Sequence, residues 1–465
     1  MKDLWQPIQF DREMLLKYDR PGPRYTSYPT APHFEDGFGH SEYVRLLERS
    51  AESGRRLSLY VHIPFCAHRC FFCGCNVTIS HDRQWGKRYL PLLAREMEMA
   101  AAALGSDGPD RREVVQVHWG GGTPTFLPPE DLTELMALIR RSFRLGEDCE
   151  IGVEVDPREC SPAHLDALAA AGVNRLSMGL QELDPRVQEA VNRIQTAEQT
   201  WGVLDGARSR GIGSVNVDLI YGLPHQTPGR FALTLEEVLR MAPDRLALFN
   251  FAYLPQSFPH QTVIDPAALP SPDTKLRMLE EAIATLTAAG YVFIGMDHFA
   301  RPGDPLAQAL RGRTLTRNFQ GYSTCADSDL VGFGVSSIGE VGGGYAQNLK
   351  TVAEYGAALE QGRLPSCRGL TLSADDVLRR DVIVRLMCHF RLDKRDVERK
   401  YGIESFDRRF AAELGQLRPM EEDGLVEIDR DSIEVTPAGR LLVRNLAMCF
   451  DAWLGKTAVR YSRTV

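Results

Sequence analysis

The sequence predicts an α/β protein built around a partial (β/α)6-type barrel. Seven short apolar runs have the length and composition of strands, and stretches with a helical apolar stripe stand between them. The links between these units are short, which implies parallel strands, because a parallel pair is joined by a crossover that is usually a helix. An open doubly wound sheet is the second arrangement that this pattern allows.

Residues 1–50 are expected to form an N-terminal arm. The segment is polar and rich in turn residues around positions 20–30. Pro21, Pro23 and Pro29 lack an amide hydrogen and fix φ, so this part of the chain is expected to be extended.

Residues 51–300 are expected to form the barrel core. The predicted strands are mostly continuous apolar runs, as in a sheet that is covered on both faces. In the helix predicted at 128–142, two prolines open the first turn and the apolar residues form one stripe, and a second helix is predicted at 85–104. The predicted strands are 57–63, 114–119, 150–155, 173–179, 214–221, 245–253 and 291–296.

Two further segments complete the predicted organisation. Residues 301–369 are expected to extend the barrel and connect it to the last domain. Residues 370–465 are predicted to be mainly helical with a hairpin at 424–439, which resembles a winged helix. DNA binding is one hypothesis for this domain, but it contains as many acidic as basic residues, so a lid or packing role is favoured.

Composition excludes several classes of protein. The chain has 465 residues, 43% hydrophobic and 25% charged, which is typical of a globular protein rather than a disordered one. Its net charge of −8 argues against nonspecific nucleic-acid affinity. No apolar run approaches the roughly 18 residues that a membrane span requires. The N-terminus is charged where a signal peptide is apolar, so we expect a cytoplasmic protein.

Four of the ten cysteines lie within ten residues, at Cys66, Cys70, Cys73 and Cys75. The first three form a CxxxCxxC pattern directly after a predicted strand. Three thiolates can hold a cubane iron–sulfur cluster and leave one iron open to a small molecule. Structural zinc is the alternative, with Cys75, His62 or His68 as further ligands, but no second CxxC pair exists here. The six scattered cysteines are expected to be ordinary buried thiols.

Polar and glycine residues follow the predicted strands. Barrel enzymes carry their chemistry at the carboxyl ends of the strands, so the repetition predicts a site there, whereas a single such residue fits an ordinary turn equally well. The residues concerned are His62, Gly120, Gly121, Gly122, Glu154, Gln181 and Asp218.

These motifs together resemble a known family. CxxxCxxC after the first strand, with an aromatic residue before the third cysteine, resembles the radical S-adenosylmethionine (SAM) enzymes. The order of the motifs narrows the resemblance to the oxygen-independent coproporphyrinogen III oxidases, over nearly the whole chain. The motifs are RYTSYPTA at 24–31, CxC at 73–75, HWGGGTPT at 118–125, VEVDPR at 153–158, RLSMG at 175–179, DLIYGLP at 218–224, GMDHFAR at 295–301 and RNFQGY at 317–322.

The resemblance implies a set of cofactor ligands. It implies that Cys66, Cys70 and Cys73 bind a [4Fe–4S] cluster and that two SAM molecules bind beside it. Phe72 would offer a flat face for adenine. The positions implied for the first SAM are Tyr60, Gly121, Glu154, Ala252 and Ile338, and those for the second are Gly122, Thr123, Gln181, Arg193 and Asp218. On the residues alone, a surface arginine is the less favoured alternative for Arg193.

The resemblance also implies the reaction. Two propionate side chains of coproporphyrinogen III would be decarboxylated to vinyl groups, giving protoporphyrinogen IX in haem biosynthesis. A low-potential donor such as flavodoxin or ferredoxin and a monomeric enzyme are expected. Cys75 and Tyr60 are expected to be catalytic, with Cys75 not a cluster ligand. The candidate partners of the substrate carboxylates are Arg24, Arg301, Arg311, Arg313 and Arg317, and Tyr25, Tyr28 and Tyr322 either line the macrocycle or belong to the core.

Two other functions compete with this enzyme. One is a haem-binding chaperone that keeps the cluster without this turnover, and the other is a cluster-bearing regulator that binds DNA. The arm and the CxC pair at 73–75 favour the decarboxylating enzyme.

Overall fold

The computed structural model describes residues 8–105, 112–456 and 461–464. Within them the chain forms two compact units. Of the described residues, the barrel unit comprises 35–105, 112–270 and 327–371, and the second unit comprises 8–34, 271–326, 372–456 and 461–464. The division into consecutive segments 1–50, 51–300, 301–369 and 370–465 stays a prediction, and residues 1–7, 457–460 and 465 of its outer segments lie outside the described residues.

The centre of the barrel unit is a parallel sheet. Its strands are hydrogen-bonded in the order β14-β2-β5-β6-β7-β8-β9, and each neighbouring pair is parallel. The bounds are β2 (Arg56–Ile63), β5 (Glu113–Gly121), β6 (Arg144–Val155), β7 (Arg175–Gln181), β8 (Ser214–Tyr221), β9 (Arg245–Asn250) and β14 (Ser328–Phe333).

Antiparallel strands extend this sheet beyond β14. The order there is β1-β17-β16-β15-β14. In the described part of the unit β1 and β9 do not pair with each other, so the sheet is open and the barrel is partial. The bounds are β1 (Glu35–Asp36), β15 (Ile338–Val341), β16 (Gly344–Asn348) and β17 (Ser366–Thr371).

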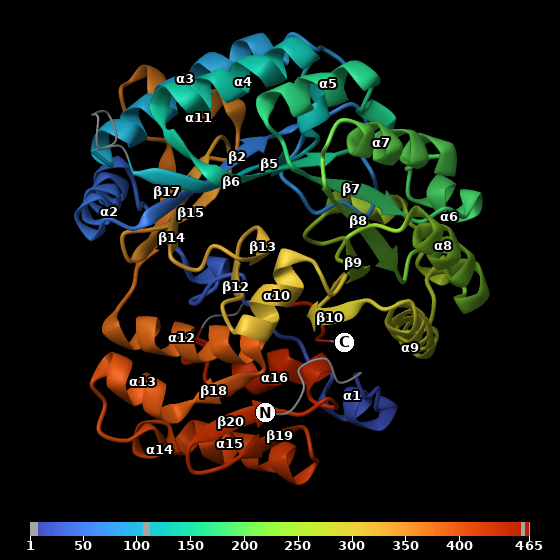
Figure 1. Cartoon of the computed structure of the whole chain (residues 1–465), viewed down its shortest axis with the longest axis vertical. Coiled ribbons are helices and arrows are strands. Elements are labelled where there is room, and N and C mark those ends of the chain that lie inside the picture. The colour runs from blue at the N-terminus through green and yellow to red at the C-terminus, as the bar shows by residue number, and fades with distance from the viewer. Residues whose placement is uncertain (1–7, 106–111, 457–460, 465) are drawn as a thin grey trace. The chain divides into compact units, whose positions relative to one another are not determined.

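Helices join the parallel strands and cover the outer side of the sheet (Figure 1). Several begin with a proline in the first turn, and Ser161 and Thr227 cap two of them, which satisfies amide groups that a helix start leaves unpaired. The bounds are α2 (His40–Ser53), α3 (Trp85–Ala103), α4 (Pro129–Ser142), α5 (Pro162–Ala171), α6 (Pro185–Ala190), α7 (Ala197–Ser209), α8 (Pro228–Met241) and α11 (Val352–Glu360).

The predicted strands and helices of the barrel are confirmed with shifted ends, except that the strand predicted at 291–296 is β10 (Val292–Gly295), which belongs to the second unit and pairs antiparallel there. β6 begins at Arg144 instead of residue 150. Its first half pairs with β5 but is polar and partly exposed, so no apolar run in the sequence marks it. β9 ends at Asn250, three residues before the predicted end. The stripe of α4 is buried as expected, since Leu132, Leu135 and Ile139 have no exposed area.

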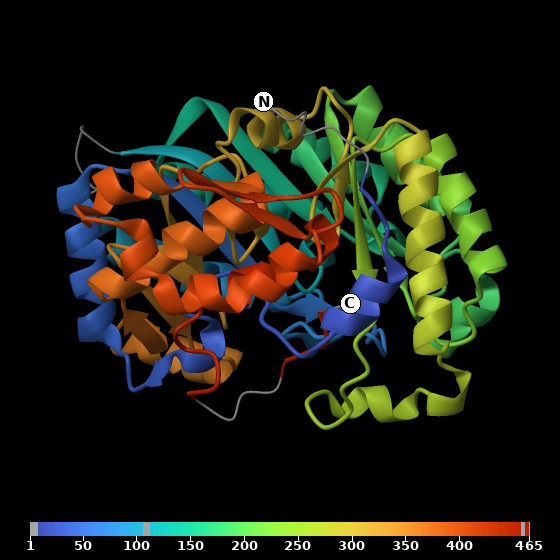
Figure 2. The ribbon, with the colours of Figure 1, turned by 90° about the horizontal axis from the view of Figure 1, so that it is seen from below.

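The second unit is mainly helical. Its carboxyl-terminal part combines helices with a three-stranded sheet in the order β18-β20-β19, which confirms the predicted hairpin (Figure 2). The bounds are α1 (Arg12–Tyr18), α9 (Pro272–Ala288), β10 (Val292–Gly295), β11 (His298–Ala300), α10 (Pro305–Gly312), β12 (Thr316–Asn318), β13 (Gly321–Ser323), α12 (Ala374–His389), β18 (Arg391–Asp393), α13 (Lys394–Tyr401), α14 (Phe406–Arg409), α15 (Ala411–Glu422), β19 (Val426–Ile428), β20 (Ser432–Val435) and α16 (Val443–Met448).

Residues 20–30 form hydrogen bonds to residues 444–452. The buried guanidinium of Arg444 donates hydrogen bonds to the carbonyls of Gly22 and Pro23. Tyr25 donates to Asp451 at 2.9 Å, and the hydroxyl of Tyr28 accepts from an amide of the same C-terminal segment. The described arm is therefore an integral part of the second unit up to residue 34, whereas α2 belongs to the barrel unit.

None of the helices in the described part of the chain has the length and apolar character needed to cross a bilayer.

Candidate active site

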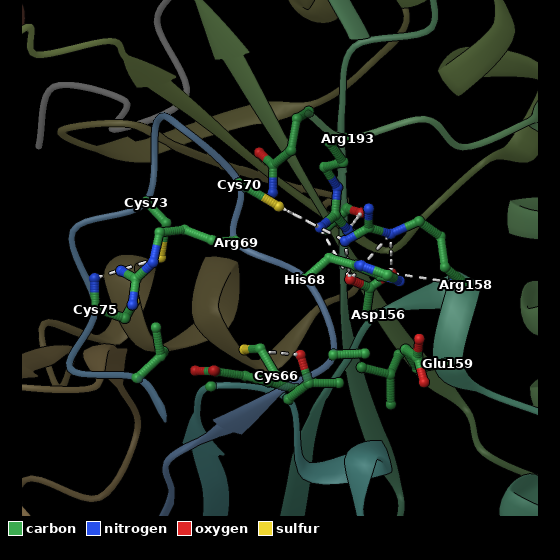
Figure 3. Close-up of a pocket in the computed structure, with 18 of the residues that line it drawn as sticks. Cys66, His68, Arg69, Cys70, Cys73, Cys75, Asp156, Arg158, Glu159 and Arg193 are labelled. Atoms are coloured by element: carbon green, nitrogen blue, oxygen red, sulfur yellow. Dashed lines mark hydrogen bonds and ion pairs between the residues drawn. The ribbon is translucent and has the colours of Figure 1, made fainter. Parts of the chain in front are cut away.

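A pocket of the barrel unit lies where the parallel strands end. The loop that carries the four clustered cysteines forms one wall, and the ends of β5, β6, β7 and β8 form the other (Figure 3). Strand register explains why these ends meet, since Glu154 pairs with Ser177 and Gly179 pairs with Asp218. The carboxyl ends of parallel strands face the same edge of a sheet, which is where such enzymes build their sites.

The cysteine loop is fastened at both ends. Cys66 belongs to the short strand β3 (Phe65–Cys66), which pairs with β4 (Thr78–Ile79) and so closes the loop. In its second half, His260 Nε2 lies 2.6 Å from the carbonyl oxygen of Cys73. The four cysteines of the loop form no disulfide, so the loop is held by hydrogen bonds.

The three thiols of the CxxxCxxC pattern differ in their surroundings. Burial raises the pKa of Cys66 to about 11, and its sulfur lies 3.4 Å from the Thr123 hydroxyl. A hydrogen bond from Cys75 lowers the pKa of Cys73 to about 6. The sulfur of the buried Cys70 accepts hydrogen bonds from Arg158 and Arg193 at 3.6 Å each.

This donor set fits an iron–sulfur cluster. Three free thiols open into one pocket, and thiolate sulfur is the ligand that binds such clusters. Among the described residues, no three His, Cys, Asp or Glu side chains are arranged to hold a single metal ion.

The glycine run 120–122 at the end of β5 allows close packing at the pocket wall. A Cβ atom on Gly120 would lie 2.7 Å from Glu154 Oε1, and one on Gly122 would lie 2.7 Å from the carbonyl oxygen of Phe65. Gly121 has a φ of +111°, and a Cβ there would lie 2.5 Å from the ring of His62. Gly121 and Gly122 therefore require glycine, and a side chain at Gly120 would displace the Glu154 carboxylate.

Glu154 is the central acid of the pocket. Its Oε1 lies 3.1 Å from His118 Nε2, and its Oε2 accepts a hydrogen bond from the Gly121 amide at 3.1 Å. Burial alone would raise the pKa of Glu154, but these partners more than offset it and lower the pKa. The carboxylate is therefore ionised at neutral pH and can accept hydrogen bonds from an ammonium or ribose group.

Asp218 is a second acid with the opposite tendency. Burial and the nearby charge of Glu154 raise the pKa of Asp218 to about 7, although hydrogen bonds from Asn216 and Ser177 partly offset the effect. Asn216 Nδ2 donates to Asp218 Oδ1 at 2.7 Å. At neutral pH this carboxyl group can therefore either donate or accept a hydrogen bond.

The structure brings most of the expected site residues to this pocket. Three expected residues are not among those that line it. Tyr60 lies within β2, with its ring parallel to that of His118 and its hydroxyl 3.0 Å from His62 Nδ1. Ala252 follows β9, and Ile338 begins β15. Those that do line the pocket are Cys66, Cys70, Phe72, Cys73, Cys75, Gly121, Gly122, Thr123, Glu154, Gln181, Arg193 and Asp218.

Sequence reasoning missed several lining residues. Asp156 and Arg158 stand in the noted motif at 153–158, and Ser177 and Gly179 stand in the motif at 175–179. Each lies two to four residues from a predicted site residue, Glu154 or Gln181, and this spacing was the available signal. Arg69, Val77 and Glu159 also line the pocket, and no pattern in the sequence marks them. His68 lines it as well, and the sequence marked it only as a further ligand of the alternative zinc site.

The candidate carboxylate partners lie in the second unit. Arg24 forms an ion pair with Asp297, and Arg317 lies 4.8 Å from the centre of the Tyr322 ring. Tyr25, Tyr28 and Tyr322 are at most 7% exposed. These tyrosines are therefore core residues in this structure, which is one of the two roles expected for them.

Known proteins match this chain over nearly its whole length. The model described as Radical SAM superfamily matches residues 60–238, and the one described as HemN C-terminal domain matches residues 372–442. The oxygen-independent coproporphyrinogen III oxidase of Salmonella typhimurium is 48% identical over 462 residues, which is 99% of each chain. That of Pseudomonas aeruginosa is 46% identical over 462 residues, 98% of this chain and 99% of the relative.

A solved structure shows the same likeness. The coproporphyrinogen III oxidase of Escherichia coli, described as a radical SAM enzyme, superposes with a TM-score of 0.90 and 48% identity, over 97% of this chain and 100% of that one. The chain therefore belongs to the oxygen-independent coproporphyrinogen III oxidases, a family of radical SAM enzymes.

Proposed function

We propose that this chain catalyses the anaerobic oxidative decarboxylation of two propionate side chains of coproporphyrinogen III, giving protoporphyrinogen IX in haem biosynthesis. The observation that carries the proposal is that Cys66, Cys70 and Cys73 open into one pocket in a chain 48% identical over its length to such oxidases.

Membership in the radical SAM family implies a [4Fe–4S] cluster and SAM. In the proposed enzyme, Cys66, Cys70 and Cys73 hold the cluster through their thiolates, leaving one iron without a protein ligand. When bound, the cluster and SAM would supply radical abstraction of a hydrogen atom from the β-carbon of a propionate, which permits loss of carbon dioxide once an electron acceptor takes up the remaining electron. Each propionate consumes one SAM.

The first SAM is proposed to bind near Gly121 and Glu154. Both residues line the pocket, and the ionised Glu154 can accept hydrogen bonds from amino or ribose groups. Phe72 offers a flat ring for adenine. Tyr60, Ala252 and Ile338 complete the proposed set, on the strength of the resemblance.

A second SAM is proposed to bind along Gly122, Thr123, Gln181, Arg193 and Asp218, all of which line the pocket. Two atoms of this set support the proposal. Within the described residues, the buried Oε1 of Gln181 and Nε of Arg193 have no hydrogen-bond partner. Buried polar atoms are rarely left unpaired, so a ligand here would satisfy both.

Cys75 and Tyr60 are proposed to act in catalysis without binding iron. The amide of Cys75 donates to the sulfur of Cys73 at 3.4 Å, so Cys75 lies next to one of the proposed cluster ligands. A Cys-x-Cys pair does not easily direct both sulfurs to the irons of one cubane, so Cys75 is left free for another role.

The remaining parts of the proposal rest on the family resemblance. The four substrate carboxylates require cations, and Arg24, Arg301, Arg311, Arg313 and Arg317 are the candidates. A low-potential donor such as flavodoxin or ferredoxin supplies the electron to a cytoplasmic, monomeric enzyme.

One anaerobic assay tests the function. Reconstituted protein with dithionite, SAM and coproporphyrinogen III is expected to release a divinyl product, with 5′-deoxyadenosine formed in a 2:1 ratio to it. Haem retained on the protein without any vinyl product would instead identify a chaperone. Electron paramagnetic resonance (EPR) of the reduced protein tests the cluster, whose signal is expected to change when SAM is added.

A further inference from the structure

Two arginines direct their guanidinium groups at the sulfur of Cys70. Arg158 Nη2 and Arg193 Nη1 each lie 3.6 Å from Cys70 Sγ (Figure 3). Cys70 is only 8% exposed, so water has little access to this sulfur. The family resemblance gives a role to Arg193 but none to Arg158.

Asp156 fixes both arginines in this orientation. Its Oδ2 accepts from Arg158 Nη2 at 2.6 Å and from Arg193 Nη1 at 3.0 Å. Its Oδ1 accepts from Nε and from the backbone amide of Arg158, both at 3.0 Å. A guanidinium held at two nitrogens by one carboxylate has little freedom to turn, so the direction of its remaining N–H groups is set.

The backbone around Cys70 is fastened to the same region. The amide of Phe71 donates to the carbonyl of Val191 at 2.9 Å, and Asn192 Nδ2 donates to the carbonyl of Arg69 at 2.8 Å. The residues on either side of Cys70 are thus bound to the residues directly before Arg193. The contact between Cys70 and the arginines is therefore held from both sides and does not depend on one mobile side chain.

The charges of Asp156, Arg158 and Arg193 do not cancel. Two guanidinium groups and one carboxylate leave one net positive charge beside a thiol that is proposed to become a cluster ligand. Reduction adds one electron to a cluster, and both N–H···S hydrogen bonds and nearby positive charge stabilise the more negative state. Loss of these groups is therefore expected to make reduction less favourable.

We propose that Arg158, oriented by Asp156, is a positioning residue of the cluster site that donates a hydrogen bond to the Cys70 thiolate and raises the reduction potential of the cluster. The inference rests on the proposed function, because it requires Cys70 to be a cluster ligand. An ordinary structural ion pair with Asp156 would stabilise the fold but would leave the potential unchanged.

The test compares four proteins after anaerobic reconstitution with iron and sulfide: the wild type, Arg158→Gln, Arg158→Lys and Arg83→Gln. Arg83 is a matched control, because it pairs with Glu159 beside the same pocket and loses the same charge when changed. Iron and sulfide content are measured first. A potentiometric titration with dithionite, followed by EPR, then gives the midpoint at which the cluster accepts one electron.

Arg158→Gln is expected to shift the reduction equilibrium about tenfold toward the oxidised cluster, which is about 59 mV for one electron. Arg158→Lys keeps the charge and is expected to fall between Arg158→Gln and the wild type, while Arg83→Gln keeps the wild-type midpoint. A folded Arg158→Gln protein that loads poorly, while Arg83→Gln loads fully, supports the positioning role as well.

Full cluster content with the wild-type midpoint in Arg158→Gln would overturn the inference. If Arg158→Gln does not fold, Arg158→Lys decides by the same two measurements, and wild-type values in both would overturn it. The proposed function fails in a different way, namely if the wild type itself takes up no cubane cluster.

Discussion

The backbone amide of Gly121 donates a hydrogen bond to Glu154 Oε2 at 3.1 Å, which joins the ends of β5 and β6 across the pocket wall. The same carboxylate approaches the preceding residue so closely that a Cβ on Gly120 would lie 2.7 Å from its Oε1. The position of the Glu154 carboxylate thus depends on the absence of a side chain at Gly120.

Gly120→Ala is therefore expected to weaken SAM binding. The added methyl group displaces the Glu154 carboxylate, and we expect a dissociation constant at least about tenfold higher, or about 1.4 kcal/mol. Equilibrium binding of SAM to the reconstituted protein measures this. Gly202→Ala on α7 is the control, because a Cβ there meets no atom within 4 Å. Equal affinity in both variants would contradict the expectation.

The cysteine loop gives a second prediction. Cys66→Ser, Cys70→Ser and Cys73→Ser are each expected to lose most of the bound iron, since a cubane held by two thiolates is weakly fixed. Cys75→Ser is expected to keep the iron and lose turnover. Iron content and product formation measured side by side distinguish the two groups, with Cys367→Ser, a free thiol of β17, as the control. Iron reduced by half in Cys75→Ser would show that Cys75 is a ligand.

The parallel core and most of the pocket could be predicted because their causes are local. Apolar runs, proline starts and glycine turns mark β2, β5 and α4 directly in the sequence. The first half of β6 could not be found, because its polar residues are held in the sheet only by pairing with β5. Asp156 and Arg158 were missed as site residues because their place in the pocket depends on a distant contact. Arg158, held by Asp156, donates to the sulfur of Cys70, which lies 88 residues earlier in the chain.

A buried acid in the barrel unit gives a prediction about pH. Glu96 on α3 is 1% exposed and accepts hydrogen bonds from Tyr355, Asn348 and the amide of Gly334. Burial raises the pKa of Glu96 to about 7, although these hydrogen bonds partly offset the rise. The ordinary value is near 4.5, so the folded state holds its proton more tightly than the unfolded state does.

The stability linked to Glu96 is therefore fully present below about pH 4.5 and is lost as the pH rises through 7. The loss in the free energy of unfolding is on the order of 3 kcal/mol. Glu96→Gln cannot ionise, so its denaturation midpoint is expected to fall less between pH 5 and pH 8 than that of the wild type. Glu98→Gln, an exposed glutamate of the same helix, should behave like the wild type. Identical pH slopes in Glu96→Gln and the wild type would refute the linkage.

Arg444→Met tests how the arm is held in the second unit. Removal of the guanidinium leaves the carbonyls of Gly22 and Pro23 without their donor, at a cost of about 1–3 kcal/mol for each buried group. Trypsin is expected to cleave this variant after Arg24 faster than the wild type, with fragments identified by mass spectrometry. The exposed Arg418→Met should be cleaved at the wild-type rate, and equal cleavage of both variants would count against the role of Arg444.

The discontinuous make-up of the second unit affects how the polypeptide folds during synthesis. All segments of the barrel unit have emerged from the ribosome once residue 371 is outside the exit tunnel. Residues 20–30, although made first, must wait for Arg444 and Asp451 before their partners exist. The nascent arm therefore lacks these partners until residues 444–451 have also left the exit tunnel.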